Sequence, residues 1–180
     1  VWVDNIKFPP FSASLAGPLT LITFAVPSTL CEGELSQLYA FATGGTGAYT
    51  FNWSPASSLN NSQIFNPLAS PAASTTYNVV LSDQATLSGS VTVNVTQNPA
   101  APVLTQAGNL LVSSAAQGNQ WYNYQGIIPG ATSQTYVPTS TNIYYVTLTN
   151  AAGCESQPSN SVYFGFTGVQ PEQGKNLSVY

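Results

Sequence analysis

Histidine and methionine are absent from this chain of 180 residues, and charged side chains are scarce. Charged residues make up 4 % of the sequence, with two lysines and six carboxylates, against about 25 % in ordinary soluble domains. Without histidine, the usual general base, the Ser-His-Asp triad and most zinc sites are excluded. Without clustered lysine and arginine, there is no surface suited to nucleic acid or to an anionic membrane.

The few carboxylates do not gather into a catalytic or metal-binding pattern. Glycosidase chemistry needs two carboxyl groups about 5 to 9.5 Å apart in a cleft, and only Glu32 and Glu34 are neighbours in sequence. These two stand in a turn beside Cys31, where solvation explains them, and no Asp-rich calcium loop is present. Neither cysteine has a basic neighbour that would activate its thiol. We therefore expect no enzyme activity, no catalytic residue, no metal site and no cofactor.

No apolar run approaches the ~20 residues that a membrane-spanning helix needs, so we expect no membrane insertion. The apolar stretch from Leu15 to Val26 is too short and is interrupted by Gly17 and Pro18. It also lacks the basic flank of a signal peptide, so we interpret it as a strand. The chain begins at Val1 rather than at a methionine, and we expect it to be a piece of a longer protein.

What the sequence does contain is a pattern that occurs twice, once in each half. In each copy an apolar strand with one tryptophan (Trp53, Trp121) is followed by polar, proline-containing loops and then by a strand that opens near a tyrosine (Tyr77, Tyr144). Apolar and polar residues alternate, turns recur every ~8 to 12 residues, and nothing has the helical period. This predicts an all-β chain of two tandem immunoglobulin-like β-sandwiches.

The positions of turn residues and prolines predict where the two sandwiches begin and end. We expect the first at residues 19–96 and the second at residues 103–166. Residues 97–102 between them read as a linker stiffened by Pro99 and Pro102. Residues 1–18 contain an extended N-terminal strand. That strand either closes a preceding jelly-roll-like domain or leads into the first sandwich, and both interpretations stay open.

Within each sandwich, the aromatic residues suit known immunoglobulin positions. One buried tryptophan on the third strand and a tyrosine at the start of the penultimate strand are features of that fold. We therefore expect Trp53 and Trp121 in the two cores and Tyr77 and Tyr144 in tyrosine corners.

Several segments also resemble known secreted modules. Residues 44–55 (Gly-Gly-Thr-Gly-Ala-Tyr-Thr-Phe-Asn-Trp-Ser-Pro), with Asn66-Pro67 and residues 75–77, resemble a PKD-type domain. Residues 118–122, residues 128–132, Tyr136 and Gly153-Cys154 are similar to the Ig-like modules that follow such domains. Both kinds of module occur in large bacterial proteins that use the type IX secretion system. Residues 176–180 resemble the opening of the C-terminal sorting domain of those proteins, so residues 167–180 are expected to be the linker into it.

The resemblance covers residues 19–166 and carries functional expectations. It implies export across the outer membrane to the cell surface or the medium, and modules that act as non-catalytic spacers or adhesins. The implied partners are a glycan, another cell-surface protein and the other domains of the same parent chain. The alternative is a pair of glycan-binding accessory modules of a secreted hydrolase.

The same resemblance bears on the two cysteines. In related Ig-like modules, a cysteine near the second strand often bonds a Gly-Cys in the last hairpin. Here the first module keeps only Cys31 and the second only Cys154, and immunoglobulin topology implies that both lie toward the junction of the modules. A disulfide between them suits an oxidising compartment, but it requires Cα atoms within ~7 Å. Two inert thiols are the competing interpretation.

For the glycan alternative, the candidate contacts are Tyr122, Tyr124 and Tyr136 in the second module. Sugar faces pack on aromatic rings, and a tyrosine adds a hydroxyl group. A sandwich with 12 % aromatic residues also exposes some of them without any ligand. Coplanar exposed rings in a groove would favour binding, whereas scattered rings would favour a spacer.

Overall fold

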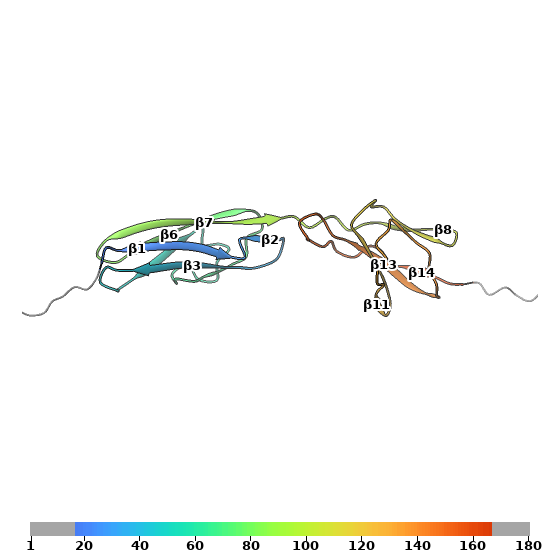
Figure 1. Ribbon diagram of the computed structural model, residues 1–180, viewed down its shortest axis with the longest axis horizontal. Helices are drawn as coiled ribbons and strands as arrows, with labels where there is room; N and C mark the ends of the chain where they lie inside the picture. Colours follow the sequence, from blue (N-terminus) through green and yellow to red (C-terminus); the bar gives the residue numbers. More distant parts are fainter. Residues whose placement is uncertain (1–16, 167–180) are drawn as a thin grey trace, which may run out of the picture. The chain divides into compact units, whose positions relative to one another are not determined.

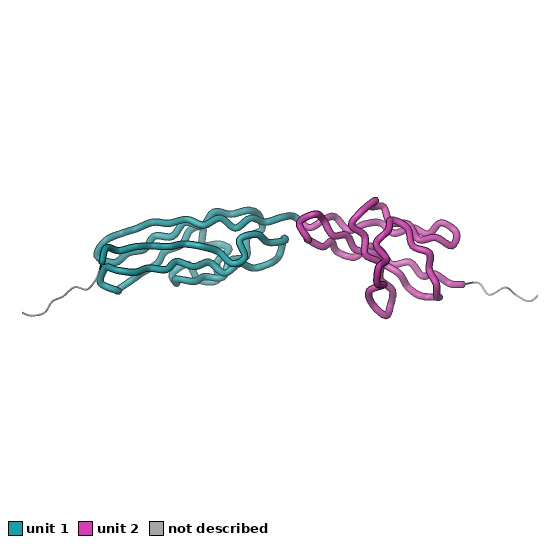
Figure 2. Tube along the Cα trace, viewed as in Figure 1, with its two compact units in different colours: residues 1–97 teal, residues 98–180 magenta. Residues whose placement is uncertain are grey.

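The computed structural model describes residues 17–166. The extended N-terminal strand was predicted within residues 1–18 and the linker into a sorting domain at residues 167–180. Residues 1–16 and 167–180 lie outside the described residues. The chain divides into two compact units, unit 1 with residues 1–97 and unit 2 with residues 98–180 (Figure 2). Throughout residues 17–166 the regular structure is β-strand, without a helix. The predicted all-β fold class is confirmed.

Unit 1 is a sandwich of two sheets (Figure 1), one with the strand order β1-β3-β5 and the other with the order β2-β7-β6-β4. The chain changes sheet at Val26-Pro27, so β2 runs parallel to β7, whereas the other strand pairs are antiparallel. The strands are β1 (Thr20–Val26), β2 (Thr29–Cys31), β3 (Ser36–Thr43), β4 (Thr50–Ser54), β5 (Leu68–Ala69), β6 (Thr75–Ser82) and β7 (Thr86–Thr96).

Strand alternation builds the core of unit 1. Successive side chains of a strand point to opposite faces, and on β6 Tyr77, Val79 and Leu81 are fully buried while the residues between them are exposed. Trp53 is 1 % exposed, and its indole nitrogen donates to the carbonyl of Ile64 at 2.9 Å. The core cluster consists of Leu30, Leu38, Ala40, Trp53, Ala69, Tyr77, Val79 and Val93.

Unit 2 is a second sandwich, with sheet orders β11-β10-β13-β14 and β12-β9-β8. Its strand pairs are all antiparallel. The strands are β8 (Leu104–Ala107), β9 (Leu110–Ser113), β10 (Asn119–Asn123), β11 (Gly126–Ile127), β12 (Thr135–Tyr136), β13 (Asn142–Leu148) and β14 (Val162–Phe164).

Unit 2 repeats the core arrangement of unit 1. Trp121 is fully buried, and its indole nitrogen donates to the carbonyl of Ser133 at 2.8 Å. In both units, therefore, a tryptophan side chain fills the core, and its indole nitrogen anchors a loop further along the chain, at Ile64 in unit 1 and at Ser133 in unit 2. The predicted burial of Trp53 and Trp121 is confirmed. The core cluster consists of Leu104, Leu111, Trp121, Tyr144, Val146 and Phe164.

Of the two predicted tyrosine corners, the structure contains the one at Tyr144 and not the one at Tyr77. The Tyr144 hydroxyl donates to the carbonyl of Ser140 at 2.8 Å, four residues upstream, which is the bond that defines a tyrosine corner. Tyr77 is also buried, but its hydroxyl pairs with the Ser58 hydroxyl at 2.6 Å. The prediction of a tyrosine corner at Tyr77 is therefore wrong. Because the long loop after β4 brings Ser58 to the ring, the hydroxyl finds its partner there instead.

Candidate binding surfaces

Within residues 17–166, no group of three or more acidic, cysteine or histidine side chains could hold a metal ion. The carboxylate of Glu34 accepts a hydrogen bond from the backbone nitrogen of Cys31 at 2.8 Å, closing the turn after β2. Asp83 accepts hydrogen bonds from the hydroxyl and the backbone nitrogen of Thr46, and these lower the pKa of Asp83 below its usual value. Both carboxylates thus accept hydrogen bonds that hold turns.

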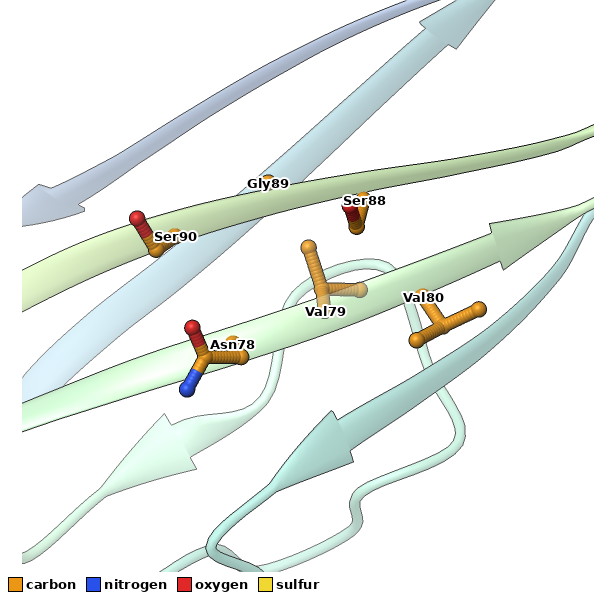
Figure 3. A pocket seen from close by; sticks show the side chains of 6 residues that line it. All are labelled: Asn78, Val79, Val80, Ser88, Gly89 and Ser90. Carbon is orange, nitrogen blue, oxygen red and sulfur yellow. The ribbon is translucent and has the colours of Figure 1, made fainter.

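The stretch that we describe also has no helix long and apolar enough to cross a membrane. Its surface has several open hollows. One, of about 210 Å³, lies over β6 and β7 and is lined by Asn78, Val79, Val80, Ser88, Gly89 and Ser90 (Figure 3). Its lining contains neither a titratable nor an aromatic side chain, so this hollow offers little chemistry for a ligand.

Gly89 in that hollow has a packing role. A Cβ atom at Gly89 would lie 2.8 Å from Cγ2 of Thr23, a separation that real Cβ atoms essentially never show. The Thr23 hydroxyl donates to the carbonyl of Ser90 at 2.9 Å, so β1 lies directly against β7 at this point. The missing side chain therefore lets the two sheets close at one edge of unit 1.

Exposed aromatic rings gather on the outer face of the β1-β3-β5 sheet in unit 1. Phe24 stacks on Tyr39 with 4.8 Å between the ring centroids. The ring centroid of Phe41 lies 5.7 Å from that of Phe24 and 5.8 Å from that of Tyr39. Phe65, from the loop before β5, approaches Phe41 at 6.3 Å. We call these four residues the β1–β3 aromatic cluster. Phe24, Phe41 and Phe65 are each between 38 % and 47 % exposed, so the cluster is an apolar surface on unit 1.

A second exposed set lies on the outer face of the β11-β10-β13-β14 sheet in unit 2. Tyr122 and Tyr145 are cross-strand partners whose rings stack at 4.9 Å with an angle of 2° between their planes. Ile143 and Tyr163 are the next cross-strand pair on the same face, 44 % and 67 % exposed. Ile127, opposite Tyr122 on β11, is 58 % exposed. We call these five residues the tyrosine face.

The side chain of Tyr163 points along the chain toward Gly165. A Cβ atom at Gly165 would meet Cε1 of Tyr163 at 3.2 Å and its hydroxyl oxygen at 3.6 Å. The ring therefore extends over Gly165, where the absence of a side chain makes room for it. Gly165 also lines a hollow of about 370 Å³, whose other lining residues are Gln106, Gly108, Asn109, Phe164 and Phe166.

The three tyrosines predicted as glycan contacts do not all come together. Tyr122 belongs to the tyrosine face, and Tyr124 is 85 % exposed in the hairpin after β10. Tyr136 lies on β12 in the other sheet, and its ring packs 5.6 Å from buried Trp121 and 5.7 Å from Tyr144. Tyr136 thus covers the core, away from the sheet face that carries Tyr122.

Sequence reasoning missed Tyr145 and Tyr163. Each stands between two inward-facing neighbours, Tyr145 between Tyr144 and Val146 and Tyr163 between Val162 and Phe164. Strict alternation along the strand could have placed both on the outer face.

Each cysteine occupies a definite place in its own unit. Cys31 ends β2 opposite Thr96, the last residue of β7, from which the chain leaves unit 1. Cys154 is 1 % exposed in the turn after β13, where its backbone nitrogen donates to the side-chain oxygen of Asn150 at 3.0 Å. Neither cysteine is a free thiol.

The turn that holds Cys154 lies at the end of unit 2 where the chain enters. The backbone nitrogen of Thr149 donates to the carbonyl of Gly118 at 2.8 Å, and the side chain of Asn119 donates to the carbonyl of Ala115 at 3.0 Å. The neighbouring Ser114 binds the carbonyl of Val103, the residue before β8, at 2.9 Å.

No protein-family model matches the sequence, and no curated protein matches it either. Among solved structures, the I67–I69 fragment of the titin I-band is 16 % identical, over 82 % of this chain and 65 % of that chain, with a TM-score of 0.42. Murine CEACAM1b is 14 % identical, over 82 % of this chain and 98 % of that chain, with a TM-score of 0.38. The N-terminal Ig1-2 module of the Drosophila receptor protein tyrosine phosphatase DLAR is also 14 % identical over the same shares, with a TM-score of 0.33. These likenesses concern the fold alone.

Proposed function

We propose that this chain is a pair of non-catalytic spacer and adhesion modules from a large secreted or cell-surface bacterial protein. The observation that carries the proposal is that the inward-facing side chains only pack against one another or bind other protein atoms. In both units they form closed cores, in which the only polar groups of the clusters are the indole nitrogens and tyrosine hydroxyls. Those groups all bind protein atoms, so no polar side chain of the two clusters is left to act on a substrate.

The origin of the protein is part of the proposal. The sequence resemblance of residues 44–55 to a PKD-type domain and of residues 118–122 to the following Ig-like modules supports a substrate of the type IX secretion system. Such a protein crosses the outer membrane and works at the cell surface or in the medium. Its very low charge suits a module exposed outside the cell, where solubility rests on serine, threonine, asparagine and glutamine.

Two kinds of partner follow from the exposed surfaces. The β1–β3 aromatic cluster on unit 1 is apolar and lies beside β1, which is the edge strand of its sheet, and this supports another cell-surface protein as partner. The tyrosine face on unit 2 combines rings with hydroxyl groups and supports the alternative function, glycan binding in a secreted hydrolase.

We also propose that Cys31 and Cys154 are each other's disulfide partners. Cys31 lies at the end of unit 1 where the chain leaves, and Cys154 lies at the end of unit 2 where it enters. A short, proline-containing connection of residues 97–102 separates these two ends in sequence. A bridge there would turn two independently folded modules into a stiffer spacer.

The test of the proposed function is a search for turnover. The purified 180-residue chain, incubated with a panel of soluble polysaccharides and with casein, is expected to release neither reducing ends nor peptides. A chain with Asp83→Asn, Glu32→Gln, Glu34→Gln and Glu155→Gln provides the blank, and circular dichroism confirms that it is folded, since Glu34 and Asp83 also hold turns. Product release by the unaltered chain that this variant lacks would overturn the proposal.

A further inference from the structure

We propose that unit 2 binds an uncharged polysaccharide chain along the tyrosine face, with Tyr163 and the hollow beside Gly165 as one end of the site. This deepens the proposed adhesion function and rests on it. The first support is exposure, since Tyr163, Ile143 and Ile127 place 67 %, 44 % and 58 % of their surface in solvent. Side chains of this size on one sheet face form a surface that a partner can cover.

Ring orientation is the second support. Cε1, Cζ and the hydroxyl oxygen of Tyr163 lie over Gly165, while 67 % of the surface of Tyr163 is exposed. An aromatic ring that lies on the backbone in this way is a flat apolar platform with a hydroxyl at its rim. The flat C–H face of a pyranose ring fits such a platform, and the hydroxyl can bond to a sugar oxygen.

The third support is a hollow that has Gly165 in its lining, although Tyr163 itself does not line it. Gly165 borders both the Tyr163 ring and the hollow of about 370 Å³, a volume at the lower end of the range for small-molecule sites. The carboxamides of Gln106 and Asn109 line this hollow together with Phe164 and Phe166. Carboxamides both donate and accept hydrogen bonds, which suits the paired donor and acceptor character of sugar hydroxyls.

Charge decides between classes of glycan. Tyr122 approaches one carboxylate, Glu155, with 3.5 Å between its hydroxyl and Oε1. Both lysines of the chain lie outside residues 17–166, so the described surface offers no cation to a uronate or a sulfate. The geometry therefore favours a neutral polysaccharide and disfavours an anionic one.

Comparison with unit 1 gives the reason for choosing this face over the β1–β3 aromatic cluster. In that cluster Phe24, Tyr39 and Phe41 stack on one another, and three of its four members lack a polar group. On the tyrosine face every aromatic residue carries a hydroxyl, and the Tyr163 ring has no aromatic ring stacked on it within the described residues.

The test is affinity electrophoresis of the full 180-residue chain in native gels that contain laminarin, galactomannan or hydroxyethylcellulose, with alginate as the anionic comparison. We expect retardation in at least one neutral gel and none in alginate. Tyr163→Ala should weaken the affinity about tenfold, as the loss of one stacking platform predicts. Gly165→Val should weaken it similarly, because it displaces the Tyr163 ring without removing an aromatic residue.

Phe41→Ala is the matched control, since it removes an exposed ring from unit 1 and should leave retardation unchanged. Circular dichroism confirms that each variant is folded.

If no neutral polysaccharide changes the mobility of the chain, this inference is overturned, while the proposal of a non-catalytic spacer still stands. Equal retardation of Tyr163→Ala, of Gly165→Val and of the unaltered chain would overturn the site. Retardation by alginate equal to that by the neutral gels would overturn the ligand class. Turnover of the polysaccharide would instead overturn the proposed function.

Discussion

Tyr144 donates its hydroxyl hydrogen to the carbonyl of Ser140 at 2.8 Å, while its ring lies in the core of unit 2. Phenylalanine at this position keeps the ring and leaves the carbonyl without that donor. We expect Tyr144→Phe to lower the free energy of unfolding of unit 2 by about 1 to 3 kcal/mol. Urea titration of near-ultraviolet circular dichroism measures the change.

Tyr163→Phe is the control for that substitution, since Tyr163 is 67 % exposed and its hydroxyl is in solvent reach. It should change the unfolding midpoint very little. Equal effects of the two substitutions would show that the hydroxyl of Tyr144 does not stabilise the corner.

The two cores should respond separately to loss of their tryptophans. Trp53→Ala and Trp121→Ala each remove a large buried side chain and an indole hydrogen bond, so each should cost about 3 to 5 kcal/mol in its own unit. Proteolysis coupled to mass spectrometry should show cleavage within the unit that carries the substitution, while the other unit stays protected. Exposed Ser88→Ala should leave both units protected.

Gly89 and Thr23 should be energetically coupled. Gly89→Ala places a Cβ atom 2.8 Å from Cγ2 of Thr23 and should destabilise unit 1 by about 1 to 3 kcal/mol. Thr23→Ala removes that methyl group, so the double variant should lose less stability than the two single variants added together. Strict additivity in a double-mutant cycle would contradict the close approach of β1 and β7 at Gly89.

Asp83 should make unit 1 sensitive to acid. Hydrogen bonds from Thr46 lower its pKa below the usual value of 3.8, so the folded state holds this carboxylate in its charged form. The resulting stabilisation is fully present above pH 3.8 and is lost as the pH falls below that value toward the pKa of the folded state. Asp83→Asn should therefore lower the Tm of unit 1 at pH 7 and lower it less at pH 3, where part of this stabilisation is lost. If Asp83→Asn lowers the Tm equally at both pH values, the charge of Asp83 is not what stabilises unit 1.

The proposed bridge makes a prediction about the covalent state of the oxidised chain. A chymotryptic digest under non-reducing conditions should contain one peptide pair joining Cys31 to Cys154, and reduction should separate the pair. In the chain-entropy account, a loop of about 100 residues is worth about 4.7 kcal/mol, so reduction should lower stability. Disulfide-linked dimers of the chain, in place of the internal pair, would contradict the assignment.

Local alternation predicted the sandwiches and the inward tryptophans, because a period of two along one strand needs only that strand. Alternation could not place the ring of Tyr136, which was predicted as a glycan contact but packs on the core. Its strand β12 is only two residues long and is flanked by loops. The position of Tyr163 beside Ile143 depends on the pairing of β13 with β14, which distant residues decide together. The β1–β3 aromatic cluster likewise depends on the register that sets Phe24 opposite Tyr39. Tyr77 shows the same limit, because Ser58 reaches it through a long irregular loop.

The most direct test measures binding and turnover in the same tubes. The 180-residue chain is incubated with insoluble neutral polysaccharide, and both the protein left in solution and the reducing ends released are followed over time. The account predicts that the protein leaves the solution while reducing ends stay at the level of the blank. Reducing ends that rise with time and disappear in Glu155→Gln would contradict the claim that these modules hold their partner without acting on it.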